Sequence, residues 1–127
     1  MPEAEGVALN DSYLQFASCA LSRGFASTAT PIAQRIHAHN HFTQRSDNQR
    51  LGARILILTA YWLRVNFPFI YRFTNKLLAQ GMGTYWKAGG VSPDSRSSVD
   101  LYLSETILPQ RIEITGRAIY HYLKAHL

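Results

Sequence analysis

The chain has 127 residues, 46% of them apolar and 17% charged, so it can bury the core of one domain and is neither two domains nor a disordered tail. Its single cysteine, Cys19, excludes an internal disulfide and a four-cysteine zinc module, and no uninterrupted apolar run reaches the roughly 18 residues of a simple membrane anchor. The formal net charge of +5 includes ten arginines among thirteen bases, which favours an acidic partner such as another protein, RNA or lipid headgroups.

The first predicted elements are short helices. Residues 1–11 form an acidic N-terminal segment that carries three acids and no base. Asn10 or Asp11 can cap a helix that continues to position 22, because a side-chain oxygen there accepts hydrogen bonds from the free amides of the first turn. A second helix is predicted to start at Pro31, which follows a threonine and suits the first helical position.

Three alternating histidines follow, at His37, His39 and His41. On a helix, His37 and His41 lie four residues apart and could share a metal ion, with His121 or His126 as a distant third ligand. Because no nearby carboxylate would orient the imidazoles, surface histidines at the end of a short helix explain this run equally well. We predict no metal site, no bound cofactor and no catalytic residue.

Cys19 could act as a nucleophile only beside a base and an orienting group, for which the sequence offers histidines at unknown distance. Its alanine and leucine neighbours instead predict a buried, inert thiol.

The longest and most apolar predicted helix covers residues 48–67. At 3.6 residues per turn, one packing face is formed by Leu51, Ile55, Leu58, Trp62 and Val65. Further apolar residues lie on the opposite side, at Leu56, Ala60 and Leu63. A narrow polar strip contains Arg50, Arg54 and Arg64, with Ile57 and Tyr61 between them. A helix of this kind has to be enclosed by its own bundle, by partner subunits or by lipid.

Residues 55–71 are too poor in apolar character to insert alone into a membrane. A central arginine costs about 2.5 to 3.5 kcal/mol on the insertion scale, and each strongly apolar residue contributes only about −0.3 to −0.6 kcal/mol. Arg64, Asn66 and Pro68 together therefore bring the insertion free energy to zero or above. The segment could still lie in a membrane inside a larger assembly.

A second helix is predicted over residues 69–80, with Gly81 as its stop. Residues 81–98 contain four glycines and a proline, which predicts a long irregular loop. Such a loop is uncommon in a compact domain unless it binds something. Tyr85 and Trp86 would then be interface anchors, or they fold back onto the protein's own core.

The last elements are predicted at residues 98–108 and 110–126, separated by Pro109. The first is read as a helix, although its apolar alternation would also suit a strand. The second is a helix that places three apolar residues on one face, namely Ile112, Ile119 and Leu123. Gly116 weakens this helix and would let another helix approach closely.

Together these elements predict a mainly α protein, a single small domain over residues 1–127. Five or six helices surround a central apolar helix, with a long irregular loop near 81–98.

The segment 23–27 resembles the end of a mitochondrial presequence, because an arginine there is followed by a glycine and an aromatic residue. The acids of the N-terminal segment argue against a transit peptide. The mitochondrion is favoured over the cytoplasm on this motif alone.

Two main functions are expected from these features. The first is a non-catalytic accessory subunit of a larger multi-protein assembly, such as a mitochondrial membrane complex, with protein or lipid-headgroup contacts at Arg54, Tyr61, Trp62, Arg64, Arg72, Tyr85 and Trp86. The second is RNA binding, because residues 12–93 carry a formal charge of +8 with interleaved aromatics. A small metal-binding or enzymatic domain using His37 and His41 is a weaker third.

Overall fold

The computed structural model of the chain describes residues 3–22 and 47–124, with side chains from residue 12 onward in the first of these segments. They form α1 (Glu3–Leu21), α2 (Asn48–Asn66), the 3-10 helix η1 (Pro68–Ile70), α3 (Tyr71–Lys87), α4 (Pro93–Ser104) and α5 (Leu108–Leu123). The prediction of a mainly helical, single small domain is confirmed.

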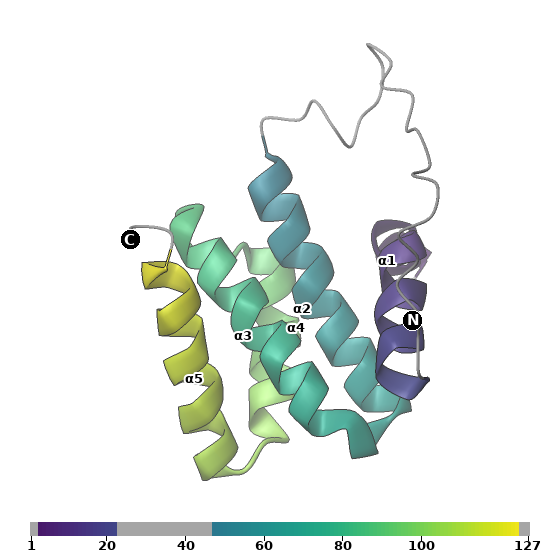
Figure 1. Cartoon of the computed structure of the whole chain (residues 1–127). Helices are drawn as coiled ribbons and strands as arrows, with labels where there is room; N and C mark the ends of the chain where they lie inside the picture. The colour runs from purple at the N-terminus through teal and green to yellow at the C-terminus, as the bar shows by residue number, and fades with distance from the viewer. Residues whose placement is uncertain (1–2, 23–46, 125–127) are drawn as a thin grey trace, which may run out of the picture.

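The helices form a bundle in which α2 is central (Figure 1). α2 contacts α1 on one side, α3 on the other and α4 behind, and α3 in turn packs along α5. α5 lies at the outer edge of the bundle, on the side of α3 away from α1. The apolar helix predicted over 48–67 is thus enclosed by other helices of its own chain.

The buried residues of α2 face three neighbouring helices and do not form a single stripe. Ile57, which the sequence places in the polar strip, is fully buried, whereas Val65, predicted to lie on the packing face, is exposed. A single apolar stripe describes a helix with one partner. α2 has partners on three sides, so nearly its whole circumference is covered.

Gly81 does not end a helix, so this prediction is wrong. α3 continues through Gly81 and Gly83 to Lys87 because both glycines face close neighbours. A Cβ built on Gly81 would lie 2.8 Å from Ile57 Cγ1, and one built on Gly83 would lie 2.6 Å from the carbonyl oxygen of Ala118. The missing side chains let α2 and α5 approach α3 closely.

The long loop predicted near 81–98 is also wrong, since only residues 88–92 separate α3 from α4. Gly89 and Gly90 make this link short, because both have positive φ angles, of 92° and 102°. Pro93 then occupies the first turn of α4, where its missing amide is tolerated. Residues 98–104 belong to this helix and not to a strand.

Helix α1 and Cys19 also differ from expectation. α1 begins at Glu3 and not at position 10 or 11, and Cys19 is exposed, where a buried thiol was predicted. The reason is that α1 packs against the bundle on one side, mainly on α2, so its outer face is uncovered. Three predictions lie outside the described residues: the helix starting at Pro31, the histidine run from His37 to His41 and the presequence-like segment 23–27.

Within residues 3–22 and 47–124, no helix combines the length and apolar character needed to cross a membrane.

Candidate docking surface on helix α5

Arg64, expected to meet an acidic partner, lies in an interior polar cluster. Its guanidinium donates to Asn75 Oδ1 at 3.3 Å and to the carbonyl oxygen of Glu105 at 3.2 Å, and its Cζ lies 4.6 Å from the centre of the Tyr102 ring. The Tyr102 hydroxyl donates to Asn75 Oδ1 at 2.7 Å and lies 2.7 Å from Thr74 Oγ1. Burial raises the pKa of Tyr102, which keeps this hydroxyl protonated. Arg64 therefore ties α2 to α3 and to the end of α4.

Tyr85 and Trp86 fold back onto the protein's own core. Tyr85 is 2% exposed, and its hydroxyl lies 3.0 Å from the hydroxyl oxygens of both Ser92 and Ser95. Trp86 is partly buried against the core. Of the two alternatives for this pair, the structure has the internal one, because the residues belong to a helix and not to a loop.

The other predicted contact residues are dispersed. Arg54 is partly buried, and its Nε has no hydrogen-bond partner among the described residues. The Tyr61 and Trp62 rings meet edge to face with their centres 5.1 Å apart. Arg72 is exposed on α3, where its Nε donates to the Tyr71 hydroxyl at 3.4 Å. The seven residues named from the sequence do not form one surface.

Helix α5 has an apolar face that the bundle does not cover. The exposed apolar residues on this face are Leu108 (68%), Ile112 (65%), Ile119 (46%) and Leu123 (51%). Their spacing of three or four residues, with Gly116 at the centre, aligns them along one side of the helix. Ile114 and Ala118, on the opposite side, are fully buried. We call the exposed set, Leu108, Ile112, Gly116, Ile119 and Leu123, the α5 stripe.

The centre of the α5 stripe is hollow. A depression of about 390 Å³ lies over Gly116 and is lined also by Ile112, Ile119, Thr115 and Arg111. A Cβ built on Gly116 would meet no atom within 4 Å. A hollow between two bulky apolar side chains is the shape that receives a protruding side chain from a neighbouring helix.

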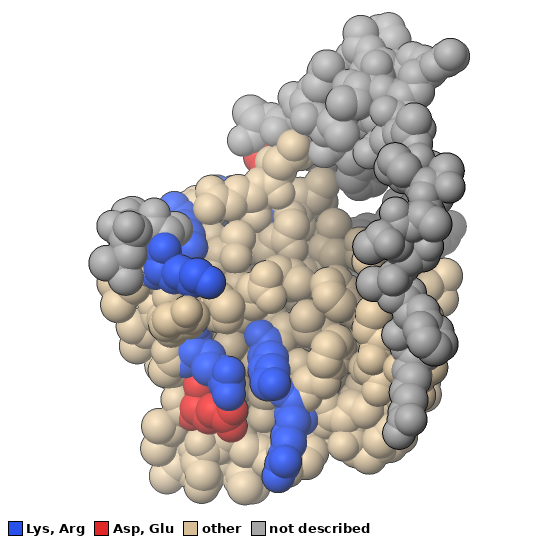
Figure 2. All heavy atoms as spheres, viewed as in Figure 1, with Lys and Arg blue, Asp and Glu red and all other residues tan. Residues whose placement is uncertain are grey.

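A charged groove runs beside the stripe, between α3 and α5. It has a volume of about 450 Å³ and is lined by Tyr71, Arg72, Lys76, Gln110, Glu113 and Arg117. Arg117 Nε donates to Glu113 Oε1 at 2.9 Å, and both side chains are about half exposed. Figure 2 shows bases gathered over this face with one acidic patch among them. Three bases against one acid make the groove positive.

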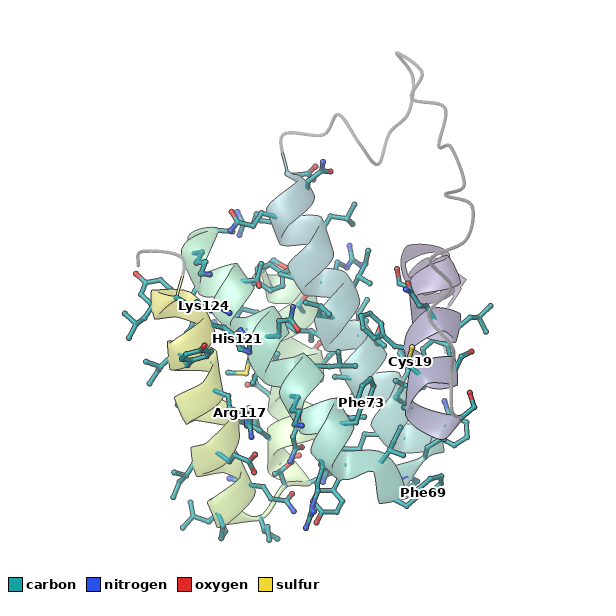
Figure 3. The ribbon with its side chains drawn as sticks, viewed as in Figure 1. Cys19, Phe69, Phe73, Arg117, His121 and Lys124 are labelled. Carbon is teal, nitrogen blue, oxygen red and sulfur yellow. The ribbon has the colours of Figure 1, made fainter. Side chains whose placement is uncertain are left out.

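The positive charge continues toward the end of α5 (Figure 3). Partial burial lowers the pKa of His121, and the charges of Lys87, Lys124 and Arg117 lower it further. These bases extend the row of cations that starts at Arg72 and Lys76. We call the set Arg72, Lys76, Lys87, Arg117 and Lys124 the basic seam.

The basic seam borders the α5 stripe along one edge. Arg117 directly follows Gly116, and Lys124 directly follows Leu123, so each cation lies about 100° around the helix from a stripe residue. Arg117, His121 and Lys124 lie on the side of α5 next to α3 (Figure 3). The α5 stripe and the basic seam therefore lie on neighbouring sides of the helix, with Glu113 and the exposed Tyr120 between them.

Comparisons of the chain with protein-family models, with curated proteins and with solved structures give no match. In the described part of the chain, no group of three histidine, cysteine, aspartate or glutamate side chains could hold a metal ion.

The sequence already indicates the stripe, since Ile112, Ile119 and Leu123 were predicted to share a face. Periodicity cannot say whether that face points inward or outward. The contact at Gly83 helps to decide it, because the missing side chain lets α3 approach the backbone of α5 at Ala118 and Tyr122. That pairing depends on tertiary structure and leaves the stripe outside.

Proposed function

We propose that the protein is a non-catalytic subunit of a larger multi-protein assembly, which it joins through the α5 stripe. The supporting observation is that α5 buries one apolar face inside the bundle and exposes a second. Full burial of a leucine or isoleucine side chain contributes about 1.5 to 3 kcal/mol. Covering the remaining exposed half of four such residues would contribute on the order of 3 to 7 kcal/mol.

The apolar surface that favours an assembly lies on α5 and not on α2. From its sequence alone, the apolar helix at 48–67 is expected to need other material around it. α1, α3 and α4 supply that enclosure, so α2 no longer requires a partner chain. The uncovered apolar surface on α5 does.

A mitochondrial membrane complex is the more specific form of this proposal. Its support is the presequence-like segment 23–27 and the basic character of the chain. Fractionation of cells that express the chain with a C-terminal tag tests it, and a signal confined to the cytosol would contradict it.

RNA binding is the second candidate, which the basic seam favours. Tyr85, however, lies inside the core and offers no face for stacking on a base. Affinity for a single-stranded RNA that falls steeply as salt is raised would support this function, because phosphate contacts release counterions. The apolar stripe has no role in such binding.

The experiment for the assembly compares two double variants of the full chain. Ile112→Asp/Ile119→Asp places charges in the α5 stripe, and Val65→Asp/Phe69→Asp places the same charges on exposed apolar residues elsewhere. In native extracts separated by size, we expect the wild-type chain and the Val65/Phe69 variant to elute with the assembly. The Ile112/Ile119 variant should elute near 14.3 kDa.

Circular dichroism of each purified variant checks that the helices are retained. If the Ile112/Ile119 variant keeps its helices and still elutes with the assembly, α5 is not the docking surface.

A further inference from the structure

We propose that the α5 stripe receives an amphipathic helix of another protein, whose apolar edge is bordered by acidic residues and which crosses α5 at Gly116. This inference rests on the proposed function and names the chemistry of the partner. Two features of the surface support it: its hollow centre and the positive charge beside it.

The hollow over Gly116 favours a helix as the occupant. Two helices pack by placing side chains of one into depressions of the other, and a glycine at the crossing point brings their axes close together. A lipid surface would instead be matched by bulky residues protruding from the middle of the stripe. Here the middle is a depression of about 390 Å³ between Ile112 and Ile119.

The basic seam requires acidic groups on the partner. Arg72 and Lys76 of α3 and Arg117 of α5 line the same groove, where Glu113 is the one acid among the described lining residues. Lys87 and Lys124 add positive charge at the other end, as the lowered pKa of His121 reflects. A second copy of this chain is disfavoured, since it also carries a net charge of +5 and would bring its own seam to the contact.

Positive charge lies on both edges of the stripe, because the exposed Arg111 lines the hollow on the side away from the basic seam. Arg111, near the other edge, donates to the carbonyl oxygens of Thr106 at 2.7 Å and Ser104 at 3.2 Å. Its guanidinium is therefore engaged in holding the turn between α4 and α5. These bonds to neutral carbonyl oxygens leave the charge of Arg111 in place, so acidic residues are favoured on both sides of the partner's apolar edge.

The test uses two fluorescent synthetic helical peptides and the full-length protein. Both peptides carry the same leucine edge, and the border beside it is glutamate in one and lysine in the other. Anisotropy titrations should give at least tenfold tighter binding for the glutamate peptide. That preference should shrink as salt is raised, because charges at the rim of a contact are screened.

Two protein variants make the assignment specific. Lys76→Glu/Arg117→Glu reverses charge in the groove, and Arg50→Glu/Arg96→Glu makes the same change in net charge on exposed bases away from it. The first variant should lose the preference or prefer the lysine peptide. The second should keep the preference of the wild-type chain.

Each outcome bears on the proposal. Equal binding of both peptides overturns the acidic partner while leaving docking through the stripe intact. Binding of neither peptide overturns the inference, and the elution of the Ile112/Ile119 variant still decides the proposed function separately. Binding to phosphatidylserine vesicles that is lost in that variant, with no peptide binding, assigns the stripe to a membrane surface and overturns the protein helix.

Discussion

Gly116 lowers the stability of α5, but it keeps the hollow open for a docking partner. Glycine in a helix interior is less favourable than alanine by about 0.5 to 1 kcal/mol, and the space around Gly116 is open. We therefore expect Gly116→Ala to raise the free energy of unfolding by up to about 1 kcal/mol, measured by urea denaturation. The same variant should assemble less well, because the added methyl group partly fills the hollow.

Gly83 gives the matched contrast within the same pair of helices. A Cβ there would meet the Ala118 carbonyl oxygen, a backbone atom that cannot rotate away. Overpacking of about 1 to 3 kcal/mol opposes a propensity gain of about 1 kcal/mol or less. We expect Gly83→Ala to lower the free energy of unfolding in the same denaturation experiment. A stability equal to that of Gly116→Ala would contradict the close approach of α3 and α5.

Glycines mark the limit of what single residues reveal from sequence. Gly81 was predicted as a helix stop, because glycine readily adopts the left-handed conformation that ends helices. It also permits close helix contacts, and only the position of Ile57 and Ala53 opposite Gly81 decides between these roles. Gly89 and Gly90, a few residues later, do occupy the positive φ region that glycine favours.

At the scale of elements, the predictability of a helix depended on how many neighbours it has. The helix over 48–67 was predicted almost to the residue, since its apolar content is high and Pro68 follows its end. The loop at 81–98 was not, because two facing helices stabilise a glycine-rich turn of α3 that local propensity disfavours. The orientation of α5 was beyond reach for the same reason.

The contact between α3 and α5 should weaken in mild acid. The pKa of His121 is lowered below 6.5 in the folded chain, so the unfolded chain takes up a proton first as the pH falls. The free energy of unfolding is unaffected by His121 above that ordinary value. The free energy of unfolding decreases as the pH falls from 6.5 through the lowered pKa of His121, and it levels off at lower pH.

Urea denaturation at about pH 8 and about pH 5, with wild type and His121→Gln compared, isolates this contribution. The wild-type chain should lose more stability between the two conditions than the variant, which has no imidazole to protonate. Equal losses would show that protonation of His121 does not change the free energy of unfolding.

At the scale of the whole molecule, α1 should open before the rest of the bundle. It packs mainly on α2, with a 3.2 Å hydrogen bond from Asn66 Nδ2 to the Tyr13 hydroxyl, and it contacts α3 through the tilted pair of Phe16 and Phe73. In native-state hydrogen exchange, we expect amides of residues 12–21 to exchange faster than those of α2 and α3. Equal protection of α1 and α2 would mean that the chain unfolds as one unit.

The order of the helices along the chain also has a kinetic consequence. α2 is followed at once by η1 and α3, its main partner, and this kind of local pairing belongs to helical bundles that fold within microseconds to milliseconds. Until α3 is in place, α5 exposes Ile114 and Ala118 as well as the α5 stripe. A helix with apolar residues exposed on two faces promotes aggregation. Rapid formation of the α2–α3 hairpin therefore shortens the period in which newly made chains adhere to one another.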